Sequence, residues 1–400
     1  MIERTSFRPC QFAPWLVAAL FACATLNSAA ADDTRPFAKW FKYSADIEST
    51  WDVIGNSAQP MNVVIRQKEP TGPEKRILVL YPRASSAYDT AITEMLRLFS
   101  AKEINARFAV TNFEMDDGRA KSAVQDAENN KFDLIFAMGS ESAAWLYTHY
   151  RGGLLPVVTV CSKDPVLLGQ MKDYESGSGT NIAFTSLNVP VEVQMAYVRE
   201  LRPDLKNIAI LVDKKNISAM QTQAEPIAAY AKKKGIQIIW GTVQNPDKAR
   251  DELTKIIPDA VHTMRQTDPE LNNSLFWITG STAVFREIIT INKFSDRVPV
   301  VSVVPEIVTP GADTAVLAIG VSFESNARLA AIYGAQILNG SKPGNFKVGL
   351  VSPPDVAISF MKARAIGLRI PFNFFEIASF VYDYKGEAVR TANKDSEHSQ

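Results

Sequence analysis

The stretch 132–145, FDLIFAMGSESAAW, constrains the fold of this chain more than any other. An apolar run typical of a buried strand ends at Gly139-Ser140, and helix-type spacing begins at once. This pattern predicts a strand, a tight turn and the N-terminus of a helix. Ligands of open α/β sheets lie where the carboxyl ends of strands face helix N-termini, because free backbone N–H groups point there. We therefore expect a ligand site at this turn.

Alternating strands and helices run through both halves of the chain. Continuous apolar strands that alternate with helices indicate parallel sheets buried on both faces. The fold class is therefore α/β, and the repeated pattern predicts two doubly wound parallel-sheet lobes with a ligand between them. The strands are expected over 77–81, 106–111, 132–138 and 156–160 in the first half, and over 207–212, 236–240, 275–279 and 298–303 in the second. Helices are expected between them, with one over 191–201 and a short one over 356–365.

Residues 1–31 have the pattern of a secretory signal peptide. Arg4 and Arg8 precede an apolar run over 15–26, and small residues follow as far as Ala31. We expect cleavage after Ala31 and a periplasmic mature protein. The sequence Leu-Phe-Ala-Cys ending at Cys23 also resembles a bacterial lipobox, so lipid anchoring at Cys23 is the alternative. No later run reaches the roughly 20 apolar residues that a membrane helix needs.

The composition excludes several classes of function. The chain has 43 basic and 43 acidic residues, so there is no basic excess for nucleic acid or an anionic membrane. Cleavage after Ala31 leaves Cys161 as the single cysteine, which rules out an intramolecular disulfide. Three histidines leave little room for a histidine-based metal site or catalytic triad. We expect no metal and no cofactor.

Polar residues follow the predicted strands of the first half. Ser140 and Ser142, with the amides from Gly139 on, suit a carboxylate, although serine is also a common helix cap. Ser162 and Asp164 follow the strand over 156–160, where Asp164 before proline is equally typical of a turn. Cys161, directly before Ser162, is more typical of a buried filler than of a nucleophile. Three further candidates in this half are Thr180 and Phe184, where the chain first crosses between lobes, and Tyr88.

The second half places polar residues at the equivalent strand ends. Each of these alone is more often a helix cap than a ligand contact. Glu306 follows the last regular strand and could pair with a ligand ammonium, or it could be a solvated loop residue. The candidates at the equivalent positions are Asp213, Asn216, Thr279, Ser281 and Thr282.

Several short motifs follow one another in a fixed order over about residues 76–372. They are Gly139-Ser140, Asp164-Pro165, Gly179-Thr180-Asn181, Leu201-Arg202-Pro203, Val298-Pro299-Val300, Gly311-Ala312 and the closing Gly367-Leu368-x-Ile370-Pro371. Together they resemble the ABC-transporter substrate-binding family that includes tryptophan- and tyrosine-binding periplasmic proteins. The resemblance implies a type I periplasmic binding fold, with two lobes joined by three crossovers, that delivers a small solute to a permease.

The resemblance also suggests how the chain divides. We expect an N-terminal extension over 32–75 that packs on the first lobe, with a possible edge strand over 61–65. The N-terminal lobe should comprise 76–186 with about 311–345, and the C-terminal lobe 187–310 with about 346–384. A polar tail over 385–400 is expected to be disordered.

Our sequence-based hypothesis is a monomeric periplasmic solute-binding protein that closes two lobes around a small molecule, such as an aromatic or other amino acid, for an ABC permease and its ATPase. Ser140, Ser142 and Thr180 would hold a carboxylate, Asp164 with Asp213 or Glu306 an ammonium, and Tyr88 and Phe184 an apolar side chain. A periplasmic sensor that feeds a membrane histidine kinase or chemoreceptor is the alternative. A hydrolase is disfavoured, because no histidine lies near Cys161 in the sequence.

Overall fold

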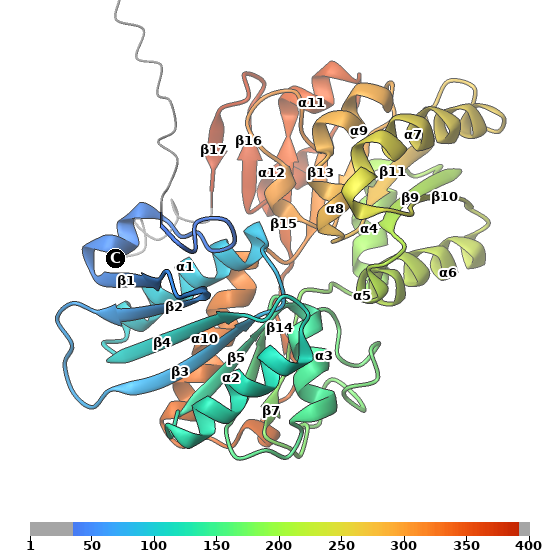
Figure 1. Cartoon of the computed structure of the whole chain (residues 1–400). Helices are drawn as coiled ribbons and strands as arrows, with labels where there is room; N and C mark the ends of the chain where they lie inside the picture. Colours follow the sequence, from blue (N-terminus) through green and yellow to red (C-terminus); the bar gives the residue numbers. More distant parts are fainter. Residues whose placement is uncertain (1–34, 392–400) are drawn as a thin grey trace, which may run out of the picture. The chain divides into compact units, whose positions relative to one another are not determined.

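The computed structural model describes residues 35–391 of the 400-residue chain. The predicted signal peptide, with Ala31 and Cys23, lies outside the described residues, as does most of the predicted tail. Within 35–391, every helix is too short or too polar to cross a membrane. Two large sheets organise the described chain, and three short segments connect them (Figure 1).

The first sheet has seven strands in the order β1-β2-β4-β3-β5-β6-β7. Its strands β3 to β7 run parallel, as expected from their continuous apolar sequences. Alternate residues of β3 face opposite sides: Leu78 and Leu80 pack with α2 and α3, whereas Ile77 and Val79 pack with α1 and α10. The elements of this lobe are β1 (Trp51–Asn56), β2 (Gln59–Gln67), β3 (Lys75–Tyr81), α1 (Ser86–Ala101), β4 (Ala106–Asn112), α2 (Asp117–Asn129), β5 (Leu134–Met138), α3 (Gly139–His149), β6 (Val157–Val160), β7 (Ile182–Ala183) and α10 (Phe323–Leu338).

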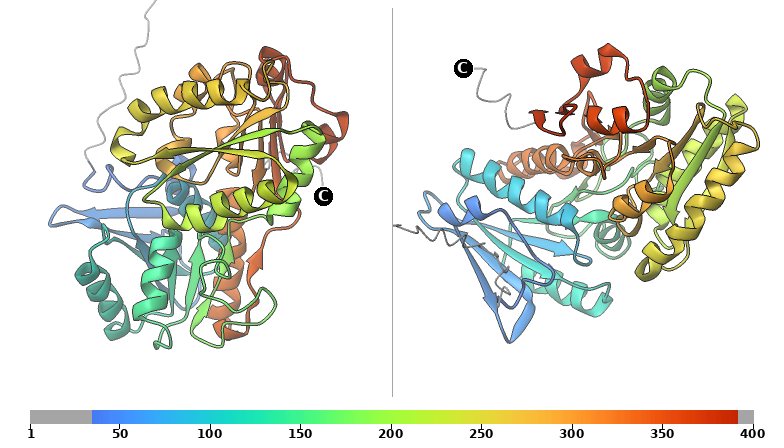
Figure 2. Two further views of the ribbon diagram at one scale, coloured as in Figure 1. Left: turned by 90° about the vertical axis from the view of Figure 1, so that its right-hand side faces the viewer. Right: turned by 90° about the horizontal axis from the view of Figure 1, so that it is seen from above.

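The second sheet has eight strands in the order β10-β9-β11-β12-β13-β15-β16-β17. Strands β10, β9, β11, β12 and β13 are parallel, and helices cover both faces (Figure 2). The elements of this lobe are α4 (Val191–Leu201), β9 (Asn207–Asp213), α5 (Ile217–Ala219), a π turn (Met220–Ala224), α6 (Glu225–Lys234), β10 (Gln237–Val243), α7 (Ala249–Arg265), β11 (Ser274–Ile278), α8 (Thr282–Phe285), α9 (Ile288–Phe294), β12 (Val300–Ser302), β13 (Leu317–Gly320), β15 (Asp355–Ser359), α11 (Phe360–Ala365), α12 (Phe372–Ile377), β16 (Phe380–Tyr382) and β17 (Ala388–Arg390).

Three short segments carry the chain from one sheet to the other. The first follows β8 (Thr185–Ser186) and leads into α4, the second joins β13 to α10, and the third joins β14 (Gly349–Leu350) to β15. Strands β8 and β14 pair with each other in a small sheet of their own, so two of the crossovers are hydrogen-bonded together. Loops that follow parallel strands of both sheets therefore come near these crossovers.

The N-terminal extension builds the edge of the first sheet. Strands β1 and β2 form an antiparallel hairpin, and β2 pairs with β4. The segment 61–65, which the sequence marks as a possible edge strand, lies within β2, but β1 is the edge. The 3₁₀ turn Ala45–Ser49, which precedes the hairpin, lies against α1.

Three expectations differ from the structure. The segment 314–320 was expected in the N-terminal lobe, but β13 lies within the second sheet, and only α10 returns to the first. A helix expected over 356–365 begins as strand β15, because its short apolar run Val-Ala-Ile-Ser suits a buried strand as well as a helix. The tail expected to be disordered from 385 contains strand β17, which pairs with β16.

Candidate functional site

A cavity of about 320 Å³ lies where loops at the carboxyl ends of both sheets meet. Loops after β3, β5 and β6 of the first lobe supply one side, and loops after β9, β10 and β11 of the second lobe supply the other. Its polar and charged lining comes from Arg83, Ser85, Tyr88, Ser140, Glu141, Cys161, Lys163, Asp213, Lys215, Asn216, Ser218, Asp247, Thr282 and Arg286.

Ser140 holds a loop in place instead of capping its helix. It is the second residue of α3, and the cap position is Met138, which has no side-chain cap bond. The Oγ atom of Ser140 accepts a hydrogen bond of 2.9 Å from the backbone N–H of Lys163. The hydroxyl hydrogen remains able to donate to a ligand in the cavity.

Lys163 is the buried cation of the cavity. Its side chain is only 8 % exposed, and burial lowers the pKa of Lys163 to about 8, although Glu141 acts in the opposite direction. Its Nζ atom lies against the other lobe, since a Cβ at Gly280 would come within 2.5 Å of it. Among residues 35–391, no acidic side chain forms an ion pair with Lys163. A buried ammonium without a counter-charge favours an anionic group of a ligand.

Asp213 faces the cavity from the second lobe. It ends strand β9, and Oδ1 accepts a hydrogen bond of 2.9 Å from the backbone N–H of Lys215. Oδ2 accepts no hydrogen bond from the described residues and can receive one from a ligand. Asn216 nearby caps α5 through a bond from the N–H of Ala219 to its Oδ1. The neighbouring π turn directs Gln223 to the N–H of Gly280 at 2.7 Å.

Tyr88 forms an aromatic wall of the cavity. It lies in the first turn of α1, and its ring is in edge contact with Tyr81 at 5.4 Å. Gly139 lies beneath the Tyr88 hydroxyl and has a φ of +77°, which few other residues tolerate. Phe285 and Phe323 add apolar surface from the second lobe and from the start of α10.

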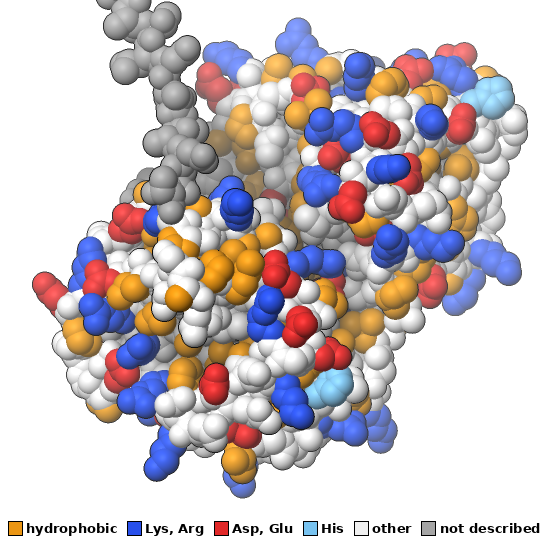
Figure 3. Space-filling model, viewed as in Figure 1, with side chains coloured by type: hydrophobic (Ala, Val, Ile, Leu, Met, Phe, Trp, Pro, Cys, Tyr) orange, Lys and Arg blue, Asp and Glu red, His pale blue; other side chains and the backbone are white. Residues whose placement is uncertain are grey.

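Charged residues surround the mouth of the cavity. Arg83 and Glu141 form an ion pair between the β3–α1 loop and α3. Within the second lobe, exposed Arg286 donates to the carbonyl oxygen of Pro246. On the face drawn in Figure 3, basic and acidic side chains are interspersed over both lobes, without one extended patch of a single sign. This face therefore presents no broad surface of one charge beside the charged residues that line the cavity.

Several candidates from the sequence lie at this cavity and others do not. Tyr88, Ser140, Asp213, Asn216 and Thr282 line it. Gly139 lies just beneath Tyr88. The candidates that do not line it are Ser142, Ser162, Asp164, Thr180, Phe184, Thr279, Ser281 and Glu306.

Hydroxyls of several candidates that do not line the cavity bind neighbouring backbone groups. Ser142 donates to the carbonyl of Leu80, and Thr279 donates to the carbonyl of Leu211. Ser281 accepts from the backbone N–H of Asp213. These three side chains form hydrogen bonds between the ends of neighbouring strands. Ser162 donates to the carbonyl of Lys163, and Phe184 is packed in the core against Tyr147.

The three remaining candidates lie in a turn, in another hollow and at a crossover. Asp164 accepts from the N–H groups of Val166 and Leu167 and from the Tyr174 hydroxyl, so it stabilises a turn. Thr180 lies in a separate hollow beside Pro343. Glu306 accepts from the N–H of Phe323, where the second crossover enters α10, and its Oε2 has no partner among the described residues. Burial raises the pKa of Glu306 to about 8.

Sequence reasoning missed the residues whose role depends on burial. Lys163 stands in the motif Cys-Ser-Lys-Asp-Pro, yet only the folded chain shows that its ammonium is enclosed. A lysine two residues beyond the start of a strand-end loop is the signal that could have found it. No such signal marks four other residues at or next to the cavity, because only the fold of the loops brings them together. These residues are Arg83, Glu141, Gln223 and Gly280. Within the described residues, no group of His, Cys, Asp or Glu is arranged to hold a metal ion.

The family assignment follows from the sequence model that matches this chain. Residues 86–379 match the family described as ABC transporter substrate binding protein. The chain belongs to this family. It is therefore a substrate-binding protein and not an enzyme, which agrees with the resemblance seen in the motifs. No curated protein matches the chain.

Solved structures agree with the two-lobed fold. A conserved domain protein from Vibrio cholerae aligns with a TM-score of 0.62 at 18% identity, over 77% of this chain and 99% of that one. An ABC domain from Streptococcus pneumoniae in complex with L-Trp aligns with a TM-score of 0.61 at 18% identity, over 77% and 100%. A ligand-free, open substrate-binding protein with adhesive properties from Clostridium difficile gives 0.57 at 18% identity, over 76% and 97%.

Proposed function

We propose that this substrate-binding protein captures a small zwitterionic solute, an amino acid, and delivers it to an ABC permease and its ATPase. One observation carries the proposal: the buried cation Lys163 and the carboxylate of Asp213 line the same cavity from opposite lobes. A ligand with a carboxylate and an ammonium satisfies both at once. A cavity of about 320 Å³ lies at the small end of the usual range for ligand pockets.

The carboxylate of the ligand would bind on the side of the first lobe. Lys163 supplies the charge, and the free hydroxyl hydrogen of Ser140 supplies a second donor beside it. A charge-assisted hydrogen bond of this kind is worth about 1.5–3 kcal/mol. The buried ammonium of Lys163 has a desolvation cost in the ligand-free protein, and the carboxylate of the ligand would offset that cost.

The ammonium of the ligand would bind on the side of the second lobe, at Asp213. Its Oδ2 is open to a new donor, while Oδ1 keeps the bond from Lys215 that fixes the carboxylate plane. A ligand held by Lys163 on one lobe and Asp213 on the other favours the arrangement in which the two lobes lie against it. Closure of lobes around a ligand is how a partner protein can distinguish the loaded form.

The ligand side chain would lie against aromatic rings. Tyr88, Phe285 and Phe323 line the cavity, and aromatic surfaces bury large areas at a small entropic cost. This lining supports an amino acid with an aromatic or other apolar side chain. L-Tryptophan and L-tyrosine are therefore suitable first probes.

Matched ligands and matched variants test this proposal. Native mass spectrometry of the purified protein should reveal a retained ligand, and calorimetric titration with the L-amino acids should rank them. For the best amino acid, the amine without its carboxylate and the acid without its ammonium should each bind at least about tenfold more weakly. Lys163→Met should weaken binding of the amino acid but not of the amine, and Asp213→Asn the amino acid but not the deaminated acid.

Exposed residues at the same cavity provide the controls. Lys215→Met and Asp247→Asn remove one charge each from the mouth and should change affinity by less than about threefold, because exposed pairs contribute little. Equal losses in the buried and exposed variants would contradict a zwitterion held at Lys163 and Asp213. Binding of neutral sugars with no amino-acid binding would overturn the proposed ligand class.

Location and partner belong to the same proposal. We expect export to the periplasm with Asp32 as the first mature residue, which N-terminal sequencing or intact mass decides. If the first residue is instead Cys23 with acyl chains, the protein is a lipoprotein and the prediction of Asp32 is wrong. Ligand-dependent stimulation of a neighbouring permease and ATPase in proteoliposomes would support transport, whereas stimulation of a histidine kinase or chemoreceptor would favour sensing.

A further inference from the structure

The segment 36–47 lies outside the part of the chain that matches the family, yet its rings are only one ring away from Tyr88, which lines the cavity. The family model begins at residue 86. Trp40 and Phe41 pack on the ring of Tyr81, with centroid distances of 5.7 and 5.9 Å. Tyr81 in turn packs on Tyr88 at 5.4 Å and donates a hydrogen bond of 3.0 Å to the Tyr88 carbonyl. A single ring, that of Tyr81, therefore lies between the extension and Tyr88 at the cavity.

The same segment is bonded along one face of α1, the helix that carries Tyr88. The backbone N–H of Lys42 donates to Asp89 at 2.8 Å, and that of Ser44 donates to Thr93 at 3.2 Å. Asp46 accepts two bonds from Arg97, of 2.9 and 3.0 Å. Positions 89, 93 and 97 are spaced by four residues and so share one face of a helix.

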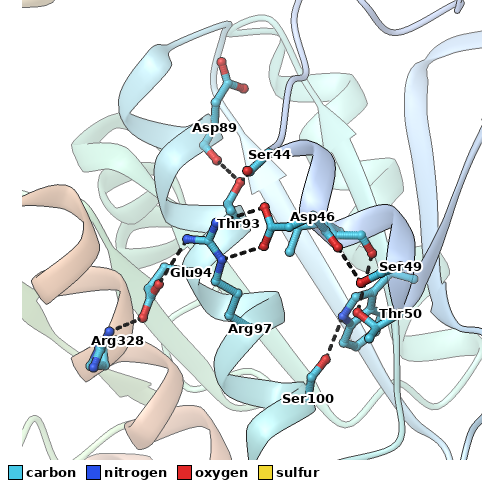
Figure 4. Close-up of polar contacts among 12 residues, drawn as sticks. Ser44, Asp46, Ser49, Thr50, Asp89, Thr93, Glu94, Arg97, Ser100 and Arg328 are labelled. Atoms are coloured by element: carbon cyan, nitrogen blue, oxygen red, sulfur yellow. Dashed lines mark hydrogen bonds and ion pairs between the residues drawn. The ribbon is translucent and has the colours of Figure 1, made fainter. Parts of the chain in front are cut away.

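An ion-pair chain extends these contacts to a second helix. Figure 4 shows Arg97 between Asp46 and Glu94, with Glu94 reaching Arg328. The Glu94–Arg328 distance is 2.6 Å, and Glu94 is only 5 % exposed. Arg328 belongs to α10, whose first residue Phe323 also lines the cavity. The contacts therefore join the extension to α1 and α10, two of the three helices of this lobe that begin at the cavity; the third is α3.

We propose that residues 36–47, which we call the brace segment, position Tyr88 for ligand binding. Rings above Tyr81 and bonds along α1 together restrict the first turn of the helix, where Tyr88 lies. The proposal goes beyond the function of the family, because the matched region does not include these residues. Trp40, Phe41 and Asp46 are positioning residues, since they act on the ligand only through Tyr81 and α1.

A second tryptophan of the extension supplies a matched control. Trp51 is buried like Trp40, with exposed fractions of 1 % and 6 %, but it belongs to β1 and donates to Ser100 near the far end of α1. Its ring packs on Phe108 and not on Tyr81. Trp40→Leu and Trp51→Leu each remove one buried indole and should lower the melting temperature similarly. Only Trp40→Leu removes a contact that leads to Tyr88.

Hydrogen–deuterium exchange of the ligand-free protein is the first measurement, and it does not require a known ligand. Exchange of the amides over 84–90 should become roughly tenfold faster in Trp40→Leu and stay near the wild-type rate in Trp51→Leu. Tyr81→Phe keeps the ring and removes only the bond to the Tyr88 carbonyl, so it should give a smaller increase in a well-folded protein. Equal exchange over 84–90 in both tryptophan variants would overturn the proposal and leave the brace segment a simple cover.

Affinity is the second measurement, with L-tryptophan and L-tyrosine as probes. For a probe that wild-type protein binds, we expect affinity to fall roughly tenfold in Trp40→Leu and less than about twofold in Trp51→Leu. Asp46→Asn keeps the shape of the side chain and weakens only its two bonds to Arg97, so exchange over 84–90 should increase by less than in Trp40→Leu. Exchange over 84–90 that stays at the wild-type rate in Asp46→Asn would count against positioning by the ion-pair chain. Lack of binding by either probe would question the proposed ligand class, but the exchange result would still decide the role of the brace segment.

Discussion

The hydroxyl of Tyr88 lies directly over the backbone of Gly139, so that a Cβ at position 139 would be 2.0 Å from the Tyr88 Oη atom. Gly139 also has a φ of +77°, a region that costs other residues about 1–2 kcal/mol. This close approach joins the turn after β5 to the first turn of α1. The glycine of the strand-end motif is therefore required both by its own backbone and by the wall of the cavity.

Gly139→Ala should destabilise the protein and weaken ligand binding, because Tyr88 must move. Gly152→Ala is the matched control, since Gly152 has a φ of +82° but no atom within 4 Å of a new Cβ. Urea unfolding should show a loss of about 1–2 kcal/mol in the free energy of unfolding for Gly152→Ala and a clearly larger loss for Gly139→Ala. Adding Tyr88→Phe should recover part of the Gly139→Ala loss. Equal costs at both glycines would mean that the Tyr88 contact is relieved without strain.

Ser140→Ala should reduce stability and affinity together. The variant leaves the buried N–H of Lys163 without its acceptor, a loss of about 1–3 kcal/mol in the free energy of unfolding. The loop that carries Lys163 is then less well fixed, so affinity for the amino acid should fall about tenfold or more. Ser140→Gly should behave in the same way, because Ser140 is not the cap of α3.

Ser85→Ala is the control for this prediction. Ser85 lines the same cavity and does cap α1, through a bond from the N–H of Ala87. Its loss should cost about 1 kcal/mol of stability and leave affinity close to wild type. Thermal melts and calorimetric titration of the two variants distinguish a ligand-side serine from a capping serine.

Glu306→Gln should stabilise the protein most at neutral and mildly alkaline pH. Burial raises the pKa of Glu306 from 4.5 to about 8, and Asp355 and Glu324 add to the rise. The unfolded chain loses this proton near pH 4.5 while the folded chain keeps it, so the folded state binds more protons between these values. The free energy of unfolding should therefore fall as pH rises from about 4.5 to 8, by more than about 1.4 kcal/mol.

The glutamine variant keeps the acceptor for the N–H of Phe323 and removes the titration. Its free energy of unfolding should lack the pH dependence that Glu306 causes between pH 4.5 and 8. The two proteins should therefore be most alike below pH 4.5 and diverge as pH increases. Chemical unfolding at several pH values measures the divergence. Parallel pH profiles for wild type and Glu306→Gln would contradict a buried protonated carboxyl at the second crossover.

The sequence predicts the layout of the fold well because long apolar strands and regular helices carry strong periodic signals. The stretch Leu134–Met138 with the helix after it is found where expected, and so is α4 over Val191–Leu201. The short strand Asp355–Ser359 lies where a helix was expected, since the three apolar residues over 356–358 do not define a period. Strand β13 joined the other sheet because pairing between distant segments decides its place, which no local pattern reveals.

The candidate site could be predicted only to the level of strand ends. Ser140 and Asp213 line the cavity because the topology brings the carboxyl ends of both sheets together. Their neighbours Ser142 and Ser281 have the same chemistry, yet their hydroxyls bind backbone groups of the adjacent strands. Which of two nearby serines faces a ligand depends on side-chain direction, and whether Lys163 is enclosed depends on the opposite lobe.

Lys163 provides the last prediction, because its charge is costly without a ligand and useful with one. Burial lowers the pKa of Lys163 from 10.5 to about 8. Between these values the unfolded chain binds more protons than the folded chain, so the free energy of unfolding of the ligand-free protein should rise with pH, by up to about 3 kcal/mol. Lys163→Met should remove this rise and be more stable than wild type at pH 7, while losing most of its affinity for the amino acid.

Proton uptake measures the same linkage in the presence of ligand. A bound carboxylate favours the charged ammonium and so raises the pKa of Lys163, and binding at pH 8.5 should take up a proton and weaken as pH increases further. Calorimetric titration in two buffers with different ionisation enthalpies measures the uptake, which should vanish in Lys163→Met and persist in Lys215→Met. A Lys163→Met protein that is less stable at pH 7, or that binds the amino acid as tightly as wild type, would show that the cavity does not use this lysine to hold a carboxylate.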